Sequence, residues 1–295
     1  MNFTSGTMFG RSLANAGSIR LLTIGSTFQM NKSYNLSVLF WPRVDYLFSD
    51  GTTGSVAANP TKERIGLVIQ KKTSTSRGLA MALDPISGNK YGSYSYGYNP
   101  NNGINMTHYN TVTTAMTDMN GEHWTYDASG TVGGIIKAND QNNFPGVYAA
   151  AHYNPGYTIT GANVGRWFLP SLGQVIAALN MMANAADYPI DWSGYTDWTH
   201  SRTGVTGKFK YICQTPLGRI FPLRGTNRKS IGTIFGGYYG SIITNTDVEA
   251  ADVSGYFCNI VYVGLFSTGD NGTKDIVLGN NLFDIGGEIR PFIHF

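Results

Sequence analysis

Charged residues are scarce in this chain of 295 residues: Asp, Glu, Lys and Arg together make up 13% of it, about half the share usual in globular proteins. The two signs nearly balance, and the formal net charge is +3. No basic run is longer than Lys71–Lys72, so the sequence lacks the positive patch of a nucleic-acid-binding protein. Low charge combined with 42% hydrophobic residues also excludes a disordered chain.

Long hydrophobic runs and a cysteine framework are missing too. The longest apolar runs, such as Val175–Leu179 and Ile260–Val263, fall far short of the roughly 18 to 20 residues that cross a bilayer, so we expect no membrane insertion. Cys213 and Cys258 lack the spacing of a structural zinc site. Two buried free thiols are favoured, and a single bridge between them stays open.

Familiar catalytic motifs are absent. The sequence holds no GxSxG, HExxH, GxxxxGK[ST] or GxGxxG pattern, and its five histidines are isolated from one another. Carboxylate pairs such as Asp45 with Asp50, or Asp191 with Asp197, would suit glycoside hydrolysis only if they faced each other. Turn-forming aspartates that cap local N–H groups are the favoured interpretation. We therefore predict a protein that is not an enzyme, with no cofactor and no metal.

What the sequence does have is glycine, tyrosine and short apolar runs. Gly reaches 37, Tyr 18 and Phe 15. Apolar runs bounded by turn residues predict strands at residues 33–40, 65–70 and 78–83, the last two joined as a hairpin. The Tyr-, Gly- and Asn-rich residues 84–110 predict a long surface loop. Short apolar and aromatic runs after Lys208 predict mostly strands and loops.

Two segments carry helical signals. Residues 171–184 (SLGQVIAALNMMAN) place Leu172, Val175, Ile176 and Leu179 on one face, the spacing of an amphipathic helix. Ser171 and Gln174 match a capping box, in which the two side chains reciprocally satisfy the first N–H groups. A shorter helix is predicted at residues 147–153, after Pro145.

The order of several segments resembles a known module. These segments are Asp45–Thr52 (DYLFSDGT), Arg64–Ile69 (RIGLVI), Arg77–Leu83 (RGLAMAL), Asp118–Gly121 (DMNG), Phe144–Tyr153 (FPGVYAAAHY), Gly165–Leu179 (GRWFLPSLGQVIAAL), Trp198–Ser201 (WTHS) and Ile289–Phe292 (IRPF). They resemble the C-type lectin-like module of Bacteroidetes surface proteins and phage fibres. Gln174 stands where that module usually has an acid, and the calcium-type lectin motifs EPN and WND are absent.

The resemblance implies an α+β protein with the C-type lectin-like fold: two helices packed on a small, mainly antiparallel sheet with long loops. Residues 1–40 would form an N-terminal arm for attachment or oligomerisation, and residues 41–295 the lectin-like domain. Related modules act outside cells, whereas Met1 begins a chain with no export signal. Phage particles reach the exterior by lysis, so this combination favours a virion protein.

The expected function is therefore that of a non-enzymatic bacteriophage virion surface or fibre protein, located on the virion surface. Its expected partners are other virion proteins, sister chains in a homotrimer, and a bacterial surface glycan or protein. A Bacteroidetes cell-surface or pilus-tip adhesin is the alternative, and a polysaccharide-degrading enzyme is the second alternative.

The ligand-binding loops are expected where the chain outgrows the module, at residues 227–251 and 267–281. Tyr238 and Tyr239 lie among glycines there, and aromatic rings offer large contact area at little entropy cost. Packing of both rings into the core is the open alternative. The predicted ligand-binding residues are Tyr238, Tyr239, Asn245, Asp270 and Asn271.

Overall fold

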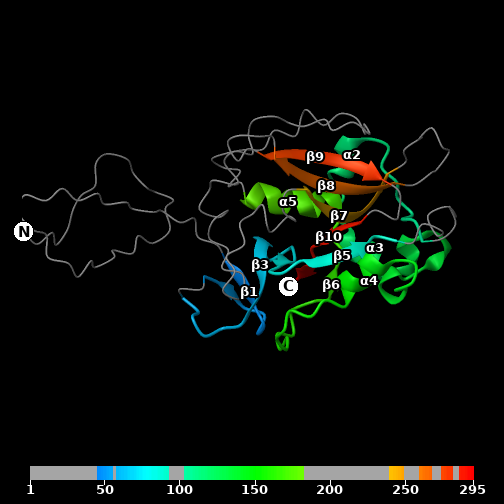
Figure 1. Cartoon of the computed structure of the whole chain (residues 1–295). Coiled ribbons are helices and arrows are strands. Elements are labelled where there is room, and N and C mark those ends of the chain that lie inside the picture. Colours follow the sequence, from blue (N-terminus) through cyan, green and yellow to red (C-terminus); the bar gives the residue numbers. More distant parts are fainter. Residues whose placement is uncertain are drawn as a thin grey trace, which may run out of the picture. The chain divides into compact units, whose positions relative to one another are not determined.

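The computed structural model describes residues 45–55, 58–92, 103–182, 239–248, 259–267, 274–281 and 286–295 (Figure 1). All of them belong to the compact unit Val44–Phe295, which contacts within the chain separate from residues 1–43. The predicted arm and the strand predicted at residues 33–40 lie outside the described residues, as do Cys213 and Cys258. The arm and its role in attachment stay predictions.

The first sheet has six strands in the order β2-β1-β3-β4-β11-β6, and all its pairs are antiparallel. Its central strands β3 and β4 are buried along nearly their whole length, as expected for strands covered on both faces. They form the hairpin predicted at residues 65–70 and 78–83, which is confirmed. The strands are β1 Tyr46–Phe48, β2 Thr53–Gly54, β3 Arg64–Gln70, β4 Leu79–Ala82, β6 Trp167–Phe168 and β11 Phe292–His294.

The second sheet has five strands in the order β5-β10-β7-β8-β9. Only β10 and β7 run parallel among the described pairs, and they meet at Glu288 and Ile242. The strand β5 lies inside residues 84–110, so the predicted surface loop is wrong for that part, and Tyr91 just after β5 is fully buried. The strands are β5 Ile86–Lys90, β7 Tyr239–Val248, β8 Asn259–Ser267, β9 Lys274–Asn281 and β10 Gly286–Ile289.

Helices connect the two sheets. The helix α5 contacts β3 of the first sheet and both β7 and β8 of the second, and Figure 1 shows it between them. Both predicted helices are confirmed as α4 and α5, and the α+β class is confirmed with them, although the described part holds two sheets. The α-helices are α2 Val112–Ala115, α3 Gly121–Tyr126, α4 Pro145–Ala151 and α5 Leu172–Met182; the 3-10 turns are η1 Ala128–Gly130, η2 Val132–Gly134 and η3 Lys137–Asn139.

The predicted apolar face of α5 forms part of the core. Leu172 and Leu179 are 0% exposed, Val175 is 1% exposed and Ile176 is 7% exposed. The cap of this helix differs from the prediction. Gln174 Oε1 does accept the N–H of Ser171, but the Ser171 hydroxyl donates to the carbonyl of Asp118 at 2.6 Å. One half of the capping box is therefore replaced by a contact that only the tertiary structure supplies.

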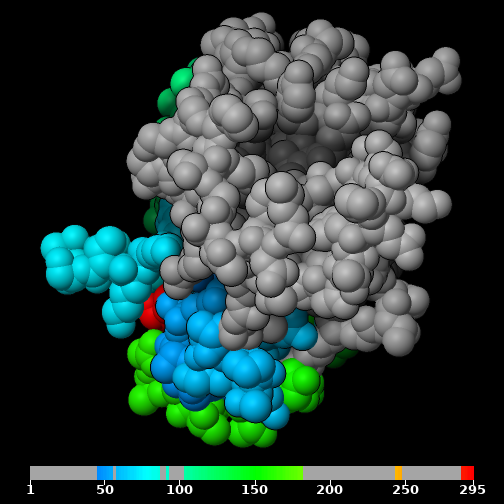
Figure 2. Space-filling model, turned by 90° about the vertical axis from the view of Figure 1, so that its left-hand side faces the viewer, coloured from blue at the N-terminus to red at the C-terminus, as the bar shows by residue number. Residues whose placement is uncertain are grey.

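The SDGT segment forms the tight turn between β1 and β2. Asp50 accepts hydrogen bonds from the N–H and the hydroxyl of Thr52, and Gly51 has φ +80°, a conformation that favours glycine. Asn163 donates to the Gly51 carbonyl at 3.0 Å. In Figure 2 the blue residues of this hairpin lie against green residues of the later segment, and the cyan β3–β4 connection projects beside them. The motif is therefore structural in this chain.

Candidate functional site

The strands β7, β8 and β9 form an antiparallel three-stranded ribbon. Its register pairs Tyr239 with Phe266 and Ser267 with Lys274, so the start of β7, the end of β8 and the start of β9 share one end. In the sequence, residues 268–273 lie between β8 and β9. The predicted site residues that lie within or directly beside these chain segments are Tyr238, Tyr239, Asp270 and Asn271.

The ribbon is fixed to the rest of the structure by a bulge in β7. Ile243 pairs with Tyr262 and Asp247 pairs with Ile260, so residues 244–246 have no register partner on β8. All three are fully buried. Because their polar groups cannot complete the ladder, they need other partners. Asn245 and Thr246 find them at the start of α5, on α3 and the segment before it, and on Tyr91.

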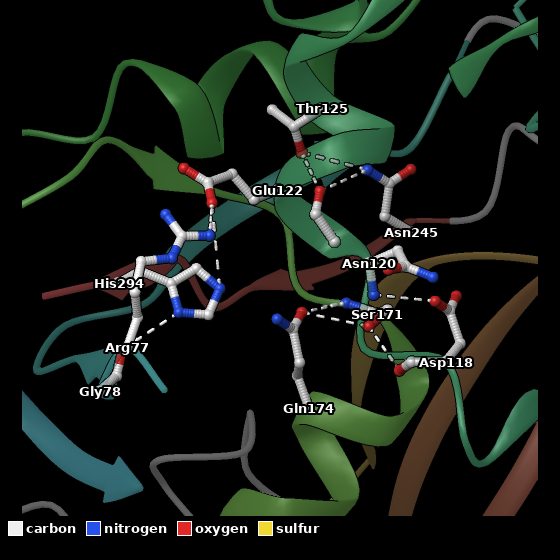
Figure 3. Close-up of polar contacts among 11 residues, drawn as sticks. Arg77, Gly78, Asp118, Asn120, Glu122, Thr125, Ser171, Gln174, Asn245 and His294 are labelled. Carbon is white, nitrogen blue, oxygen red and sulfur yellow. Dashed lines mark hydrogen bonds and ion pairs between the residues drawn. The ribbon is translucent and has the colours of Figure 1, made fainter. Parts of the chain in front are cut away.

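Asn245 occupies the centre of this bulge. Its backbone N–H donates to the carbonyl of Pro170 at 2.7 Å, and its side-chain Oδ1 accepts from the Tyr91 hydroxyl at 2.8 Å. Its Nδ2 donates to Thr125 Oγ1 at 3.1 Å, as Figure 3 shows. The expectation that Asn245 lies on an exposed loop is therefore wrong, because its amide is fully buried and holds the ribbon to the helices.

Asp118, the first residue of DMNG, is a second centre of buried hydrogen bonds. Its carboxylate accepts from Thr246 Oγ1 at 2.7 Å, from the Trp124 indole at 3.1 Å and from the Asn120 N–H at 2.9 Å. Burial raises the pKa of this carboxyl, and these hydrogen bonds partly offset the rise. Its carbonyl accepts the N–H of Gly173 at the start of α5. Asp118 thus joins α3, α5 and β7. Figure 3 shows its contacts with Asn120 and Ser171.

A buried lysine lies on the other side of Asn245. Lys137 is 0% exposed, and its Nζ donates to Asn105 Oδ1 at 2.6 Å and to the Tyr91 hydroxyl at 2.7 Å. Asp247 is also fully buried, and burial raises the pKa of its carboxyl while the charge of Lys137 opposes that rise. A buried lysine with a buried carboxylate is uncommon, because each charge loses its hydration.

A third polar group lies nearer the surface. Arg77 donates to Glu122 Oε2 at 2.5 Å, and His294 Nε2 lies 4.0 Å from the same oxygen. Nδ1 of His294 contacts the Gly78 carbonyl at 3.0 Å, and burial lowers the pKa of the imidazole. These contacts tie β11 to α3 and to the start of β4 (Figure 3). The Arg77 side chain is largely exposed, so its ion pair contributes little stability.

Of the predicted binding residues, Tyr238, Asp270 and Asn271 lie outside the described residues. Tyr239 is placed by its backbone as the first residue of β7. Their contact with a ligand stays a prediction.

The carboxylates considered for acid–base chemistry cap a turn or form an ion pair where they are described. Lys62 and Thr52 lower the pKa of Asp50 to about 2, and Asp50 caps the SDGT turn. Asp45 is ion-paired with Lys71 at 2.9 Å. Asp191 and Asp197 lie outside the described residues. Within the described part of the chain no cluster of His, Cys, Asp and Glu suits a metal ion, and no helix is long and apolar enough to span a membrane.

Sequence reasoning missed the buried polar residues Tyr91, Asn105 and Lys137. A signal exists for one of them: Lys137 follows Gly133–Ile136 (GGII) in a chain with few charges. A lysine directly after an apolar run is a candidate for burial, but its partners lie far away in the sequence. Asp118 was noticed only through the DMNG segment of the resemblance.

Comparisons of this chain with protein-family models, with curated proteins and with solved structures found no match. The C-type lectin-like fold and the functions that it implies therefore stay predictions.

Proposed function

We propose that this protein is a non-enzymatic surface or fibre protein of a bacteriophage virion, with a C-type lectin-like domain that binds a bacterial surface glycan or protein. The proposal rests on the resemblance of segments such as GRWFLPSLGQVIAAL and IRPF. One structural observation supports it best: the β7–β8–β9 ribbon is anchored by a buried bulge, and Tyr239 begins β7 at the end of the ribbon where β8 ends and β9 begins. Tyr238, Asp270 and Asn271 are close to these strand ends in the sequence.

The anchoring matters because binding loops work best on a rigid support. Residues 183–285 lie between α5 and β10 in the sequence, and β11 then completes the first sheet between β4 and β6. The described part of this long segment is attached through residues 243–247, which are all buried, and through the pairing of β7 with β10 and the contact of β8 with α5.

The ligand-binding prediction is tested by replacing Tyr238 and Tyr239 together with Ala. We expect a loss of binding of at least tenfold, measured with the full chain against intact bacterial cells and a panel of bacterial surface glycans, because aromatic anchors dominate such surfaces. The melting temperature should stay within about 2 °C of the unmodified protein. Tyr148→Ala, a half-buried ring on α4, is the matched control and should bind normally.

Unchanged binding with an unchanged melting temperature would place the site elsewhere. A large fall in melting temperature would show that these rings belong to the core.

The fibre role is tested by the oligomeric state. The full chain should sediment as a homotrimer, and a variant lacking residues 1–40 as a folded monomer, because an arm that packs against neighbouring chains loses that burial when it is removed. A full-length chain that stays monomeric at high concentration would contradict the role of the arm.

A further inference from the structure

Lys137 is buried among aromatic and amide side chains, and the proposed binding function does not require this arrangement. The Lys137 Nζ lies 5.4 Å from the centre of the Tyr91 ring and 5.5 Å from that of Phe144. Its polar contacts are the Asn105 amide, the Tyr91 hydroxyl and, at 3.4 Å, Asn245 Oδ1. A primary amine is thus held against a primary amide where side chains exclude water.

The Asn105 amide is fixed in one orientation. Its Nδ2 donates to the backbone carbonyl of Asn245 at 2.8 Å, which turns Oδ1 toward Lys137. The distance between Lys137 Nζ and Asn105 Oδ1 is 2.6 Å. Since Cγ is bonded to Oδ1 at about 1.2 Å, the nitrogen lies within about 3.8 Å of the amide carbon. A near-attack arrangement has a separation of about 3 to 3.5 Å, so only a small movement is needed.

Asp247 supplies a carboxyl group in the same cluster. Its Oδ2 accepts the backbone N–H of Asn105 at 2.6 Å, while its Oδ1 is buried without a hydrogen-bond partner among the described residues. Two buried charges are disfavoured relative to a neutral amine and a neutral carboxylic acid. Proton transfer from Lys137 to Asp247 would produce that neutral pair and leave the lysine nitrogen with a free lone pair.

We propose that Lys137 and Asn105 are a self-modification site, at which an intramolecular isopeptide bond forms and ammonia is released. The Lys137 Nζ lone pair forms a bond to Asn105 Cγ and gives a tetrahedral carbon. One proton from Nζ passes through the Asp247 carboxyl to Nδ2. The Cγ–Nδ2 bond then breaks, and Nδ2 leaves as NH₃. An amine and a primary amide become a secondary amide and ammonia, with no oxidation or reduction.

The bond would join Lys137, in η3, to Asn105, which lies 32 residues earlier in the sequence. A covalent link of this kind restricts the unfolded chain in the way a disulfide does, and it needs no cysteine. The inference does not depend on the proposed function.

The mass of the full chain after denaturation is the first test. Isopeptide formation lowers it by about 17 Da, the mass of ammonia, relative to the mass calculated from the sequence. No Lys or Arg lies between Lys90 and Lys137, and the next is Arg166. Trypsin does not cleave after an acylated lysine, so we expect one peptide of residues 91–166 instead of the peptides 91–137 and 138–166.

Cleavage after Glu122 identifies the linkage itself. Glu122 lies between Asn105 and Lys137 in the sequence, so residues 91–122 and 123–166 should stay joined after this second digestion. An unshifted mass in the full chain overturns the proposal. Ammonia loss with separated fragments also overturns it, because this indicates an internal succinimide. A loss of about 18 Da, the mass of water, also overturns it, because the chain would then have condensed an amine with a carboxyl group and not with the Asn105 amide.

Three variants test the assigned roles. Lys137→Arg, Asn105→Ala and Asp247→Asn should each show the unshifted mass and normal tryptic cleavage, and Asp247→Asn should do so while keeping the far-ultraviolet circular dichroism of the unmodified protein. Lys72→Arg, at an exposed lysine, is the matched control and should retain the shift. Linkage in the Asn105→Ala variant would overturn the pairing.

Discussion

The hydroxyl of Thr246 should be one of the most sensitive groups in the described part of the chain. It accepts the N–H of Leu172 at 2.8 Å and donates to Asp118 Oδ2 at 2.7 Å. Thr246→Val keeps the shape of the side chain but removes both bonds, leaving an N–H and a carboxylate oxygen buried without these partners. Each such group costs about 1 to 3 kcal/mol. We expect the free energy of unfolding to fall by about 2 to 5 kcal/mol.

The loss should depend on pH, because one of the two partners is ionisable. Burial raises the pKa of Asp118 in the folded protein, so this group destabilises the folded state as pH rises above its unfolded pKa of about 3.9. The Thr246 hydrogen bond is the largest of the effects that hold the pKa down. Its removal raises the pKa further, and the penalty should therefore be larger at about pH 8 than at about pH 4.

Urea denaturation followed by tryptophan fluorescence measures both effects, because the indole of Trp124 donates to Asp118. The control is Thr107→Val, an exposed threonine, which should change the free energy of unfolding by less than about 0.5 kcal/mol. A Thr246→Val penalty below about 1 kcal/mol, or one equal at both pH values, would refute the argument that this hydroxyl joins α5 to a buried carboxylate.

Other substitutions test other parts of the fold. Leu179→Ala should lower the free energy of unfolding by about 2 to 5 kcal/mol, because Leu179 is fully buried on α5; a change too small to measure in urea would contradict the packing. Gly51→Ala should destabilise the SDGT turn by at least about 1 to 2 kcal/mol, since a Cβ at φ +80° would also collide with Asn163; an unchanged melting temperature would argue against that turn. Arg290→Met should cost about 1 to 3 kcal/mol, because the buried guanidinium donates to the carbonyls of Ala82 and Leu83; calorimetry showing equal stability would exclude that role.

Local pattern predicted those elements whose signals lie within a few residues of sequence. The apolar face of residues 171–184 and the runs at 65–70 and 78–83 each specify one periodicity, and α5, β3 and β4 form there. β5 was missed because ISGNK has one apolar residue, and its pairing with β10 comes from a segment nearly 200 residues away. The β-propensity of residues 86–90 therefore does not predict the pairing of β5 with β10.

In the candidate site, too, some features could be predicted from local sequence and others depend on the tertiary structure. Sequence alone predicted short strands and an amphipathic helix at residues 171–184, with aromatic residues among glycines at Tyr238 and Tyr239. Only the tertiary structure decided that Asn245 is a buried anchor, since whether a short polar side chain faces solvent or a partner depends on strand register. The tertiary structure also determines which residues surround Lys137. A buried charge is stable only beside groups that satisfy it, and Asn105, Asn245 and Asp247 reach it only when the chain is folded.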